Sequence, residues 1–429
     1  MAELYGDSKK GTVGSIALEN NNRKGCLVMK MENGSVLAGV KVLDMGRVLA
    51  APYCASILAD MGADVIKVES PGVGDDARYN MPKKDGVSTY YVNFNRSKKG
   101  ITLNLKAPEG KEILTKLIKE ADVIIENFRP GVMAKLGFGY EDCKEINPGI
   151  IFASISGFGQ DGPYTKRAGF DPIAQAMSGI MSITGKQADK RVRCGASIAD
   201  VMAAQNAALA IVAALRYRDQ TGRGQMIDVA LTDVCIIGLS SVNLMYLTEG
   251  KIPEPLGNGY SASAPGDSFP TKEGEDTVVF LAGNQTQWST LCDVLEHPEW
   301  KEVPEFIDNV TRVKNKPKLH AAIGEVTKTM TTDEVVEKLL SVGLPVGPIM
   351  NIEQVSKDPH FQGAREMFTE VEHPKVGTLR ITNQSFKMSE TSPYVRGCSP
   401  ELGEHNMEVL TGLGYSEEEI EGFAKSGVI

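Results

Sequence analysis

The chain has 429 residues, 42% of them hydrophobic and 24% charged, with a formal net charge of −9. This length predicts two or three domains with large cores. The negative balance argues against nucleic acid and against a membrane surface as partners, so an anionic ligand would need a local basic cluster. No run of residues approaches the roughly 18 apolar positions of a membrane-spanning helix.

The N-terminal stretch and the cysteines both favour a cytoplasmic enzyme. Residues 1–36 are rich in Gly, Ser, Asn and Lys. They lack the apolar core of a signal peptide, and we expect a disordered extension there. The seven cysteines are odd in number and form no CxxC. This pattern indicates reduced thiols, with neither a disulfide framework nor a metal site.

From residue 40 the hydrophobic pattern is that of an α/β fold. VKVLDM (40–45) predicts a strand, residues 52–62 a helix ending at Gly62, and residues 63–69 a second strand. The helix PEGKEILTKLIKEA and the strands ADVIIENF and GIIFASIS follow. Alternating strands and helices predict a Rossmann-like parallel sheet with helices on both faces and a ligand at the carboxyl ends of the strands.

Such a start is typical of dehydrogenases, but the first turn argues against one. MGRVLAAPY contains a single glycine. A dinucleotide-binding turn has G-x-G-x-x-G, because the backbone must come close to the pyrophosphate. The sequence therefore predicts the sheet without a nicotinamide cofactor.

The second half predicts a smaller α+β domain inserted between two parts of the large one. A helix rich in small residues, SIADVMAAQNAALAIVAALRYRDQTG, and a strand, QMIDVAL, complete the first part. Residues 248–275 are rich in Gly, Pro and Ser, which indicates a boundary or mobile loop. We expect a large domain over 37–235 with 360–429, and a small domain with linkers over 236–359.

One carboxylate stands in an unusual place. In KRAGFDPIAQAMSG, Asp171 lies between Phe170 and Pro172, just before an apolar run that predicts a helix. Asp is a favoured N-cap and Pro suits the first helical position, so a capping role is the simplest interpretation.

Several separated motifs point to another interpretation. They are LADMGADVIKVESPGVGDDAR, NFNRSKKGITLNLK, ADVIIENFRPGVMAKLGFGY, NPGIIFASISGFGQDGP, GFDPIAQAMSG, TGRGQMIDVALTD and PELGEHNMEVL. Together they resemble the family III CoA-transferases (the CaiB/BaiF family), which include formyl-CoA and carnitine-CoA transferases and the α-methylacyl-CoA racemases. The resemblance runs in the same order from about Leu37 to the C-terminus. Only residues 1–36 lie outside it.

The resemblance implies that Asp171 is a covalent nucleophile. In the family this carboxylate attacks an acyl-CoA thioester to give an anhydride, and CoA then moves through an aspartyl thioester to an acceptor acid. A carboxylate with an ordinary pKa of about 3.9 is ionised at neutral pH, so it needs no general base. A closed, partly desolvated site would keep water from the anhydride.

The resemblance also implies a site for CoA, which is a substrate, since no permanently bound cofactor is expected. NRSKK, which we place after a strand, and RPGVMAK supply basic residues. The loop 257–271 has fewer glycines than the active-site lid of formyl-CoA transferases, yet can still close over a pocket. The residues expected to bind CoA are Arg47, Val48, Ala50, Lys98, Asn127, Phe128 and Lys135, and those expected in the substrate pocket are Leu49, Gly259 and Tyr260.

Two other functions stay open at this point. A racemase of the family carries His before the nucleophile-equivalent Asp, and proton exchange at an α-carbon needs two bases. This chain has Phe170 there, and its five histidines all follow residue 290, although Asp200 falls where racemases keep their second acid. A CoA-binding protein without turnover is the third possibility. A transferase fits best, with an acyl-CoA donor and a carboxylic acid acceptor as partners, in an interlocked homodimer.

Overall fold

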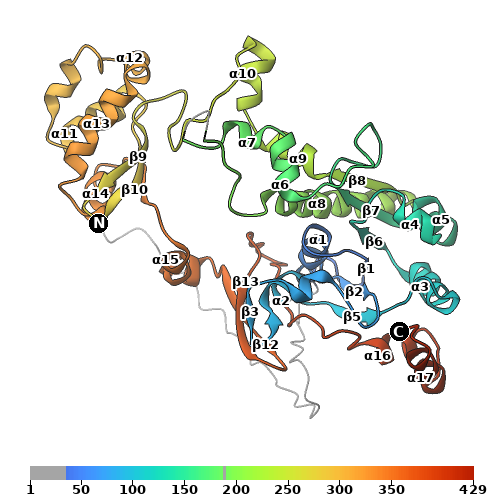
Figure 1. The fold of residues 1–429 in the computed structure, drawn as a ribbon. Coiled ribbons are helices and arrows are strands. Elements are labelled where there is room, and N and C mark those ends of the chain that lie inside the picture. Colours follow the sequence, from blue (N-terminus) through green and yellow to red (C-terminus); the bar gives the residue numbers. More distant parts are fainter. Residues whose placement is uncertain (1–34, 187–189) are drawn as a thin grey trace.

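The computed structural model describes residues 35–186 and 190–429. Figure 1 shows a large body built on a parallel sheet and a smaller body that stands apart from it. The core of the smaller body is formed by residues between Ala264 and Val346 alone. The extension expected over 1–36 lies almost wholly outside the described residues.

The sheet of the large body has six parallel strands in the order β5-β2-β1-β6-β7-β8. If these six strands are numbered in chain order, the sheet order is 3-2-1-4-5-6, which is the doubly wound arrangement. In such sheets the ligand binds at the carboxyl ends of the strands, between the first and fourth strands, where the chain connections run in opposite directions. The predicted Rossmann-like parallel sheet is confirmed. Its strands are β1 Lys41–Asp44, β2 Asp64–Glu69, β5 Lys99–Thr102, β6 Val123–Glu126, β7 Ile151–Ser156 and β8 Met226–Ala230.

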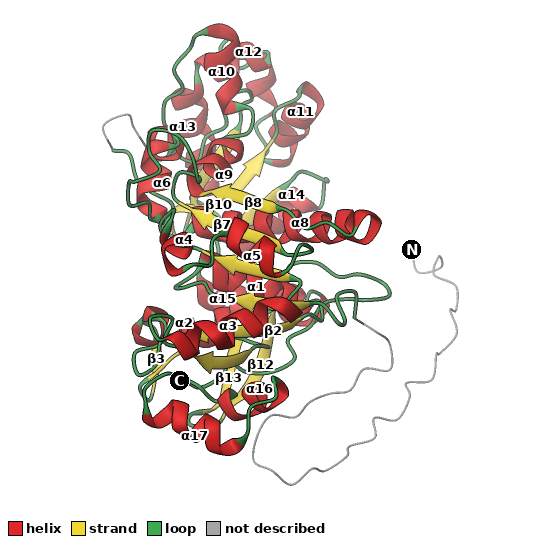
Figure 2. Ribbon diagram, turned by 90° about the vertical axis from the view of Figure 1, so that its right-hand side faces the viewer, coloured by secondary structure: helices red, strands yellow, loops and turns green. Residues whose placement is uncertain are grey.

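Alternate residues of the strands pack into two separate cores. In β6, Val123 and Ile125 contact one core while Ile124 contacts the other. This division follows from the twofold alternation of side chains along a strand, and it explains why the strand is apolar throughout. The first core includes α1 (Ala50–Asp60) and α8 (Ile198–Thr221); the second includes α3 (Pro108–Glu120), α5 (Tyr140–Ile146), α16 (Asn406–Gly412) and α17 (Glu417–Lys425). Figure 2 shows these layers beside the yellow strands.

Helix α8 corrects one expectation from the sequence. Its 24 residues have a mean hydropathy of 1.7 over the most apolar window, which is enough by length and composition to cross a membrane. The face that carries Ala203, Ala204 and Ala207 is completely buried in the first core. Small side chains let α8 lie close to α1 and β7, as in the core helix of a soluble α/β protein.

The smaller body packs helices on a three-stranded antiparallel sheet. Its strands are β9 (Gly266–Thr271), β10 (Gly274–Leu281) and β11 (Val346–Pro348), in the order β11-β10-β9. Trp288, Phe269 and Phe280 are buried at its centre. Residues 248–275 are therefore not all loop, because β9 lies near their end. The helices here are α11 Gln285–Val294, η2 Pro298–Glu302, α12 Asn309–Lys314, α13 Lys316–Thr327 and α14 Thr332–Leu340.

The chain then returns to the large body. The hairpin β12–β13 (Phe368–His373 and Gly377–Thr382) packs on Val92 of α2 (Thr89–Asn95). The NRSKK motif follows the helix α2, so its expected position after a strand is wrong. The remaining elements are η1 Asp76–Tyr79, β3 Lys83–Lys84, β4 Val87–Ser88, α2 Thr89–Asn95, α4 Val132–Leu136, α6 Asp171–Met177, α7 Ile180–Ile183, α9 Leu231–Gly238, α10 Val242–Glu249, α15 Ile352–Lys357 and η3 His360–Ala364.

Candidate active site

A folded-back loop brings Asp171 to the carboxyl edge of the sheet. After β7 the chain leaves at Gly157 and returns at Gly169, where the two backbones touch. A Cβ on Gly157 would lie 2.5 Å from the Cα of Gly169, so only glycine fits this crossing. Asp171 then begins α6, beside the end of β7.

The Asp171 carboxylate does not cap its own helix. Phe170 is the N-cap residue of α6, and α6 has no side-chain cap. One oxygen, Oδ2, instead accepts from the backbone N–H groups of Ala199 (2.8 Å) and Asp200 (3.4 Å), in the first turn of α8. The capping interpretation is therefore wrong for α6. The carboxylate satisfies the N-terminus of a different helix, whose positive dipole end favours an anion.

The other oxygen of Asp171 is held by a buried amide. Gln175, one turn further along α6, donates from Nε2 to Oδ1 at 2.6 Å. Its own Oε1 accepts from the N–H of Cys194 at 2.8 Å, which fixes the orientation of the amide. The Asp171 side chain is 4% exposed and Gln175 is fully buried. Three donors thus surround the carboxylate, namely the Gln175 amide and the N–H groups of Ala199 and Asp200, and all of them are uncharged.

Further titratable groups lie near this carboxylate. Burial and the negative charge of Asp171 raise the pKa of Asp200 to about 7. Burial, followed by the charges of Asp200, Asp75 and Asp171, raises the pKa of Tyr90 on α2. Burial also raises the pKa of the Cys235 thiol on α9. At neutral pH the tyrosine and the thiol are therefore protonated, and Asp200 is close to half protonated.

A second group of predicted residues lies at the carboxyl ends of the neighbouring strands β1 and β6. The side chain of Asn127 accepts from the N–H of Arg47 at 2.8 Å and donates to the carbonyl of the same residue at 2.9 Å. Val48 follows with a φ of 65°, rare for a β-branched residue, and its N–H donates to Asp75 at 3.0 Å. Since β7 is the next strand, Arg47, Asn127 and Asp171 lie on three consecutive loops of one sheet edge.

Lys98 is placed differently from its prediction. Its ammonium is buried and bonds to Asp44 (2.7 Å), to the Asn95 side chain (3.0 Å) and to the carbonyls of Pro52 and Phe94. Burial lowers the pKa of Lys98 to about 8, in spite of the nearby Asp44. An amine with four internal acceptors has no proton left for a phosphate. We therefore withdraw Lys98 as a ligand of CoA.

The other predicted ligands of the sheet edge differ in exposure. Leu49 is the N-cap residue of α1 and Ala50 its first residue, and both are buried. Phe128, in the loop that follows β6, is partly buried against the second core. Lys135 is exposed on α4, in the last turn of this helix. Arg47 is also exposed and pairs with Asp76 at 2.8 Å.

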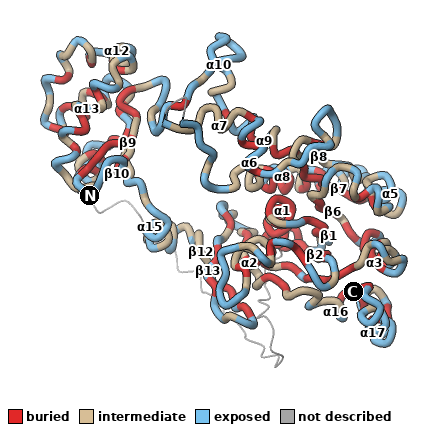
Figure 3. Tube along the Cα trace, viewed as in Figure 1, coloured by how far each residue is buried: buried red, intermediate tan, exposed pale blue. Residues whose placement is uncertain are grey.

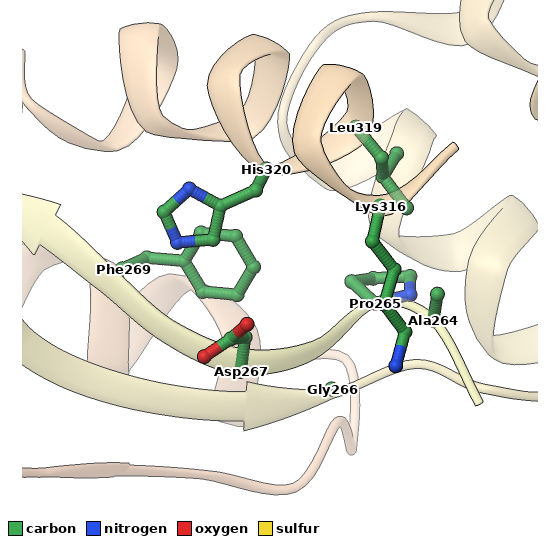
Figure 4. Close-up of a pocket in the computed structure, with 8 residues that line it drawn as sticks. All are labelled: Ala264, Pro265, Gly266, Asp267, Phe269, Lys316, Leu319 and His320. Atoms are coloured by element: carbon green, nitrogen blue, oxygen red, sulfur yellow. The ribbon is translucent and has the colours of Figure 1, made fainter. Parts of the chain in front are cut away.

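Gly259 and Tyr260 lie in the smaller body, away from Asp171. Figure 1 shows β9, which follows them, well separated from α6. They adjoin the pocket of Figure 4: the backbone N–H of Tyr260 donates to the carbonyl of Gly266, and Lys316 donates to the carbonyl of Tyr260. Within one chain the structure does not bring these two residues together with Asp171. The pocket is lined by Ala264, Pro265, Gly266, Asp267, Phe269, Lys316, Leu319 and His320.

Sequence reasoning missed two residues that shape this edge. Gln175 could have been suggested by its i,i+4 spacing from Asp171, which places both on one helical face. Asp75 had no such signal. It pairs with the buried Lys67 at 2.9 Å while it accepts from Val48, two contacts that only the folded sheet creates.

Comparison with known proteins gives consistent matches over most of the chain. The family model described as CoA-transferase family III matches residues 37–406. A human succinyl-CoA:glutarate CoA-transferase is 38% identical over 93% of this chain and 91% of its own length. A formyl-CoA:oxalate CoA-transferase of Rhodopseudomonas palustris is 36% identical, over 92% and 97%. The crystal structure of a CaiB/BaiF family protein from Brucella suis is 36% identical and superposes with a TM-score of 0.80, over 89% of this chain and 100% of that one.

Proposed function

The chain belongs to CoA-transferase family III, and from this premise we propose that it transfers CoA from an acyl-CoA thioester to a free carboxylic acid through covalent intermediates on Asp171. CoA transfer as such follows from the family. The observation that carries the covalent mechanism is the state of Asp171: a buried carboxylate at the sheet edge, held by neutral donors, with no ion pair to it among residues 35–186 and 190–429.

The first half of the reaction loads CoA onto the enzyme. An Asp171 oxygen attacks the thioester carbonyl, a C–O bond forms, and the C–S bond breaks to release the CoA thiolate. The thiolate then attacks the aspartyl carbon of the resulting anhydride. The donor acid leaves as its carboxylate, and an aspartyl-CoA thioester remains. No proton has to move in either step, so no general base is required.

The second half repeats these steps in reverse with the acceptor. Its carboxylate attacks the aspartyl-CoA carbonyl and expels the thiolate, which gives a second anhydride. The thiolate attacks the acceptor's carbonyl carbon, the new acyl-CoA departs, and Asp171 is a carboxylate again. The energy of the thioester is kept throughout, provided that water does not reach the anhydride.

We assign the binding of CoA to the loops after β1 and β6. Arg47 and Lys135 are exposed cations on this edge, and Phe128 offers a partly buried ring. The reciprocal hydrogen bonds between Arg47 and Asn127 hold the two loops together. Val48 and Ala50 complete the first turn, where backbone rather than side chains would line the site. A protein with a negative total charge can meet CoA phosphates through such a local arrangement.

The racemase alternative receives one supporting observation, the proximity of Asp200 to Asp171. It lacks a partner base. The residue before Asp171 is Phe170, which is 69% exposed, and all five histidines of the chain follow residue 290. A single carboxylate pair without an imidazole does not provide one base on each face of an α-carbon. Transfer between carboxylic acids therefore remains the function that fits the site.

For the acceptor we propose an acid larger or less polar than oxalate. Leu49 is buried at the N-terminus of α1, and its isobutyl group cannot donate a hydrogen bond to a small polar acyl group. A pocket with no hydrogen-bond donor at this position discriminates poorly in favour of oxalate or formate. A panel of acyl-CoA donors and carboxylic acids, read by mass spectrometry, tests this. Formyl-CoA with oxalate as the best pair, by more than about tenfold in kcat/KM, would contradict it.

We further propose an interlocked homodimer with the domain division given above. The separate core of residues 264–346 and the return of the hairpin β12–β13 to α2 support this division. Apolar residues on α9, α10 and the chain after them are strongly exposed, with Ile237 at 79%, Leu247 at 75% and Ile252 at 80%. Figure 3 shows much of α10 in the colour of exposed residues. Exposed apolar side chains of this kind are typical of an interface with another chain. A stable, active monomer in sedimentation at micromolar concentration would refute the dimer.

The covalent mechanism is tested on the adduct itself. Enzyme given succinyl-CoA alone, without an acceptor, should accumulate a hydroxylamine-sensitive adduct on the peptide that contains Asp171. Peptide mass spectrometry distinguishes a succinyl adduct from a CoA adduct. The binder hypothesis predicts neither adduct, and it also predicts no exchange of labelled succinate into succinyl-CoA.

A further inference from the structure

The donors around Asp171 divide its two oxygens into an inner and an outer one. Oδ1 faces Gln175, whose side chain is completely buried. Oδ2 faces the first turn of α8, where Ser197, Ile198 and Asp200 are partly exposed. A substrate arrives from solvent, so the outer oxygen is the one that can form a new bond, and the inner oxygen remains the aspartyl carbonyl.

We propose that the carboxamide of Gln175 is a catalytic hydrogen-bond donor, which stays on Oδ1 and stabilises the negative charge that develops there whenever a nucleophile adds to the aspartyl carbon. This inference rests on the proposed covalent function. When the CoA thiolate attacks the anhydride, an S–C bond forms and the π electrons of the aspartyl carbonyl move onto Oδ1. They return as the bond between the aspartyl carbon and Oδ2 breaks and the donor carboxylate leaves.

The geometry of Gln175 suits this task. The Nε2–Oδ1 distance of 2.6 Å is already short with a carboxylate as acceptor. A 180° rotation of the amide would break this bond, and it would also break the hydrogen bond that Oε1 accepts from the N–H of Cys194. It is thus pre-organised, so no water or side chain has to reorient as charge develops. The N–H of Ala199 stabilises Oδ2 in the same way, because negative charge grows on Oδ2 when the carboxylate leaves.

The donor acts on some steps and not on others. In the first step, attack on the acyl-CoA, the tetrahedral oxyanion forms on the oxygen of the substrate and not on Oδ1. In the next step it forms on Oδ1. Loss of Gln175 as a donor should therefore slow the conversion of anhydride to aspartyl-CoA thioester more than it slows the formation of the anhydride.

The chain offers a matched control for the variants. Gln384 is also buried, and its Nε2 donates to the buried Asp60 at 2.7 Å. This pair lies at the far end of α1, away from Asp171. Gln384→Glu and Gln384→Met repeat the same chemical changes beside a carboxylate with no proposed role in the reaction.

The test compares Gln175→Met, Gln175→Glu and the two Gln384 variants with the full-length wild type. Each is given succinyl-CoA, and both the exchange of labelled succinate and the intact-protein adducts are measured. The Gln175 variants should lose about a hundredfold in exchange, the usual effect of removing one oxyanion donor. They should also carry a higher ratio of succinyl to CoA adduct and hydrolyse more succinyl-CoA per exchange. The Gln384 variants should change thermal stability only.

Gln175→Glu adds a signature that a structural role would not give. Glutamate keeps the acceptor for the Cys194 N–H, and its protonated form is again a donor. Its exchange rate relative to wild type should therefore rise as the pH falls from 8 to 5.5. Exchange within threefold of wild type, or a uniform loss with an unchanged adduct ratio, overturns the role of Gln175. A wild type that exchanges labelled succinate into succinyl-CoA but carries no Asp171 adduct overturns the covalent mechanism instead.

Discussion

Two buried aspartates of the large body are held in opposite ways. Asp60, in the last turn of α1, accepts from Gln384 and pairs with the guanidinium of Arg96 at 2.8 Å. Asp171, at the start of α6, also accepts from a glutamine but otherwise meets only backbone N–H groups. Both side chains are less than about a twentieth exposed. One negative charge is neutralised by a cation, and the other is not.

This is the difference we expect between a structural carboxylate and the nucleophile that we propose. A guanidinium fork occupies both the charge and the lone pairs of its partner, which fixes the carboxylate and makes it a poor nucleophile. Neutral donors satisfy an aspartate without cancelling its charge. Burial with such donors alone is costly, and a chain tolerates that cost mainly where chemistry needs it.

The largest expected effect comes from substituting Asn for Asp at each of the two sites separately. Asp171→Asn removes the attacking oxygen charge and should reduce CoA transfer on the order of 10⁴-fold or more. Asp60→Asn should leave transfer per folded molecule nearly unchanged. It should instead lower the free energy of unfolding by about 3 kcal/mol, because Arg96 becomes an uncompensated buried cation. Exchange assays and urea unfolding of both variants measure these outcomes.

Asp171→Asn also has a structural cost that its control must cover. Both carboxylate oxygens accept hydrogen bonds, so the amide NH₂ of Asn would face either Gln175 or the N–H of Ala199, both donors. We expect a loss of roughly 1–3 kcal/mol in stability. Titration calorimetry should still show CoA binding. Near-normal turnover by a folded Asp171→Asn enzyme would sink the covalent mechanism.

A second substitution tests whether the buried charge of Lys98 serves stability or the binding of acyl-CoA. Lys98→Met leaves Asp44 with Lys67, 3.8 Å away, as its remaining cation. The free energy of unfolding should fall by about 3 kcal/mol. The KM for acyl-CoA should not change, because the Lys98 ammonium bonds only to internal acceptors. A large rise in KM in a stably folded variant would restore Lys98 as a ligand.

The smallest effect concerns pH. Burial and the charge of Asp171 raise the folded pKa of Asp200 to about 7, above the usual value near 4. The folded state therefore binds this proton more tightly than the unfolded state. Stability due to Asp200 is complete below about pH 4 and is lost as the pH rises to about 7. Asp200→Asn should raise stability by about 2 kcal/mol at pH 8, discounted for partial exposure, and by nothing at pH 4.

Thermal melts of wild type and Asp200→Asn across pH 4–8 give this difference directly. Other buried acids, such as Glu126, act equally in both proteins and cancel in the comparison. A gap between the two melting temperatures that narrows as the pH rises would show the opposite sign. In that case Asp200 would be stabilised as a carboxylate.

The sequence predicted the parts of the molecule that depend on local pattern. The strand–helix–strand start, the helices on both faces and the location of Asp171 before a helix all follow from short segments. The burial of Lys98 could not be predicted, because its main partner, Asp44, is 54 positions away and no periodicity links the two residues. Asp171 was misassigned as a possible cap of α6 because the helix it serves, α8, begins 27 positions later.

The place of the predicted pocket residues of the smaller body could not be read from the sequence for a related reason. The motifs gave Gly259 and Tyr260 a place in a family pattern but no place in space. In the structure they belong to a body with its own core, whose position relative to the sheet is set by long connections. Sequence patterns describe faces of elements, and such connections leave the relative placement of two bodies undetermined.

The left-handed backbone of Val48 matters to anyone who wishes to make this enzyme more heat-resistant. A β-branched residue at φ 65° is strained by about 1 kcal/mol or more, and Asp75 and Lys67 hold it there. Val48→Gly is an obvious stabilising substitution, because glycine adopts this conformation freely. The same freedom would loosen the turn beside Arg47. Directed evolution for melting temperature alone would therefore loosen the turn that we propose binds CoA, and selection should be applied to turnover at high temperature instead.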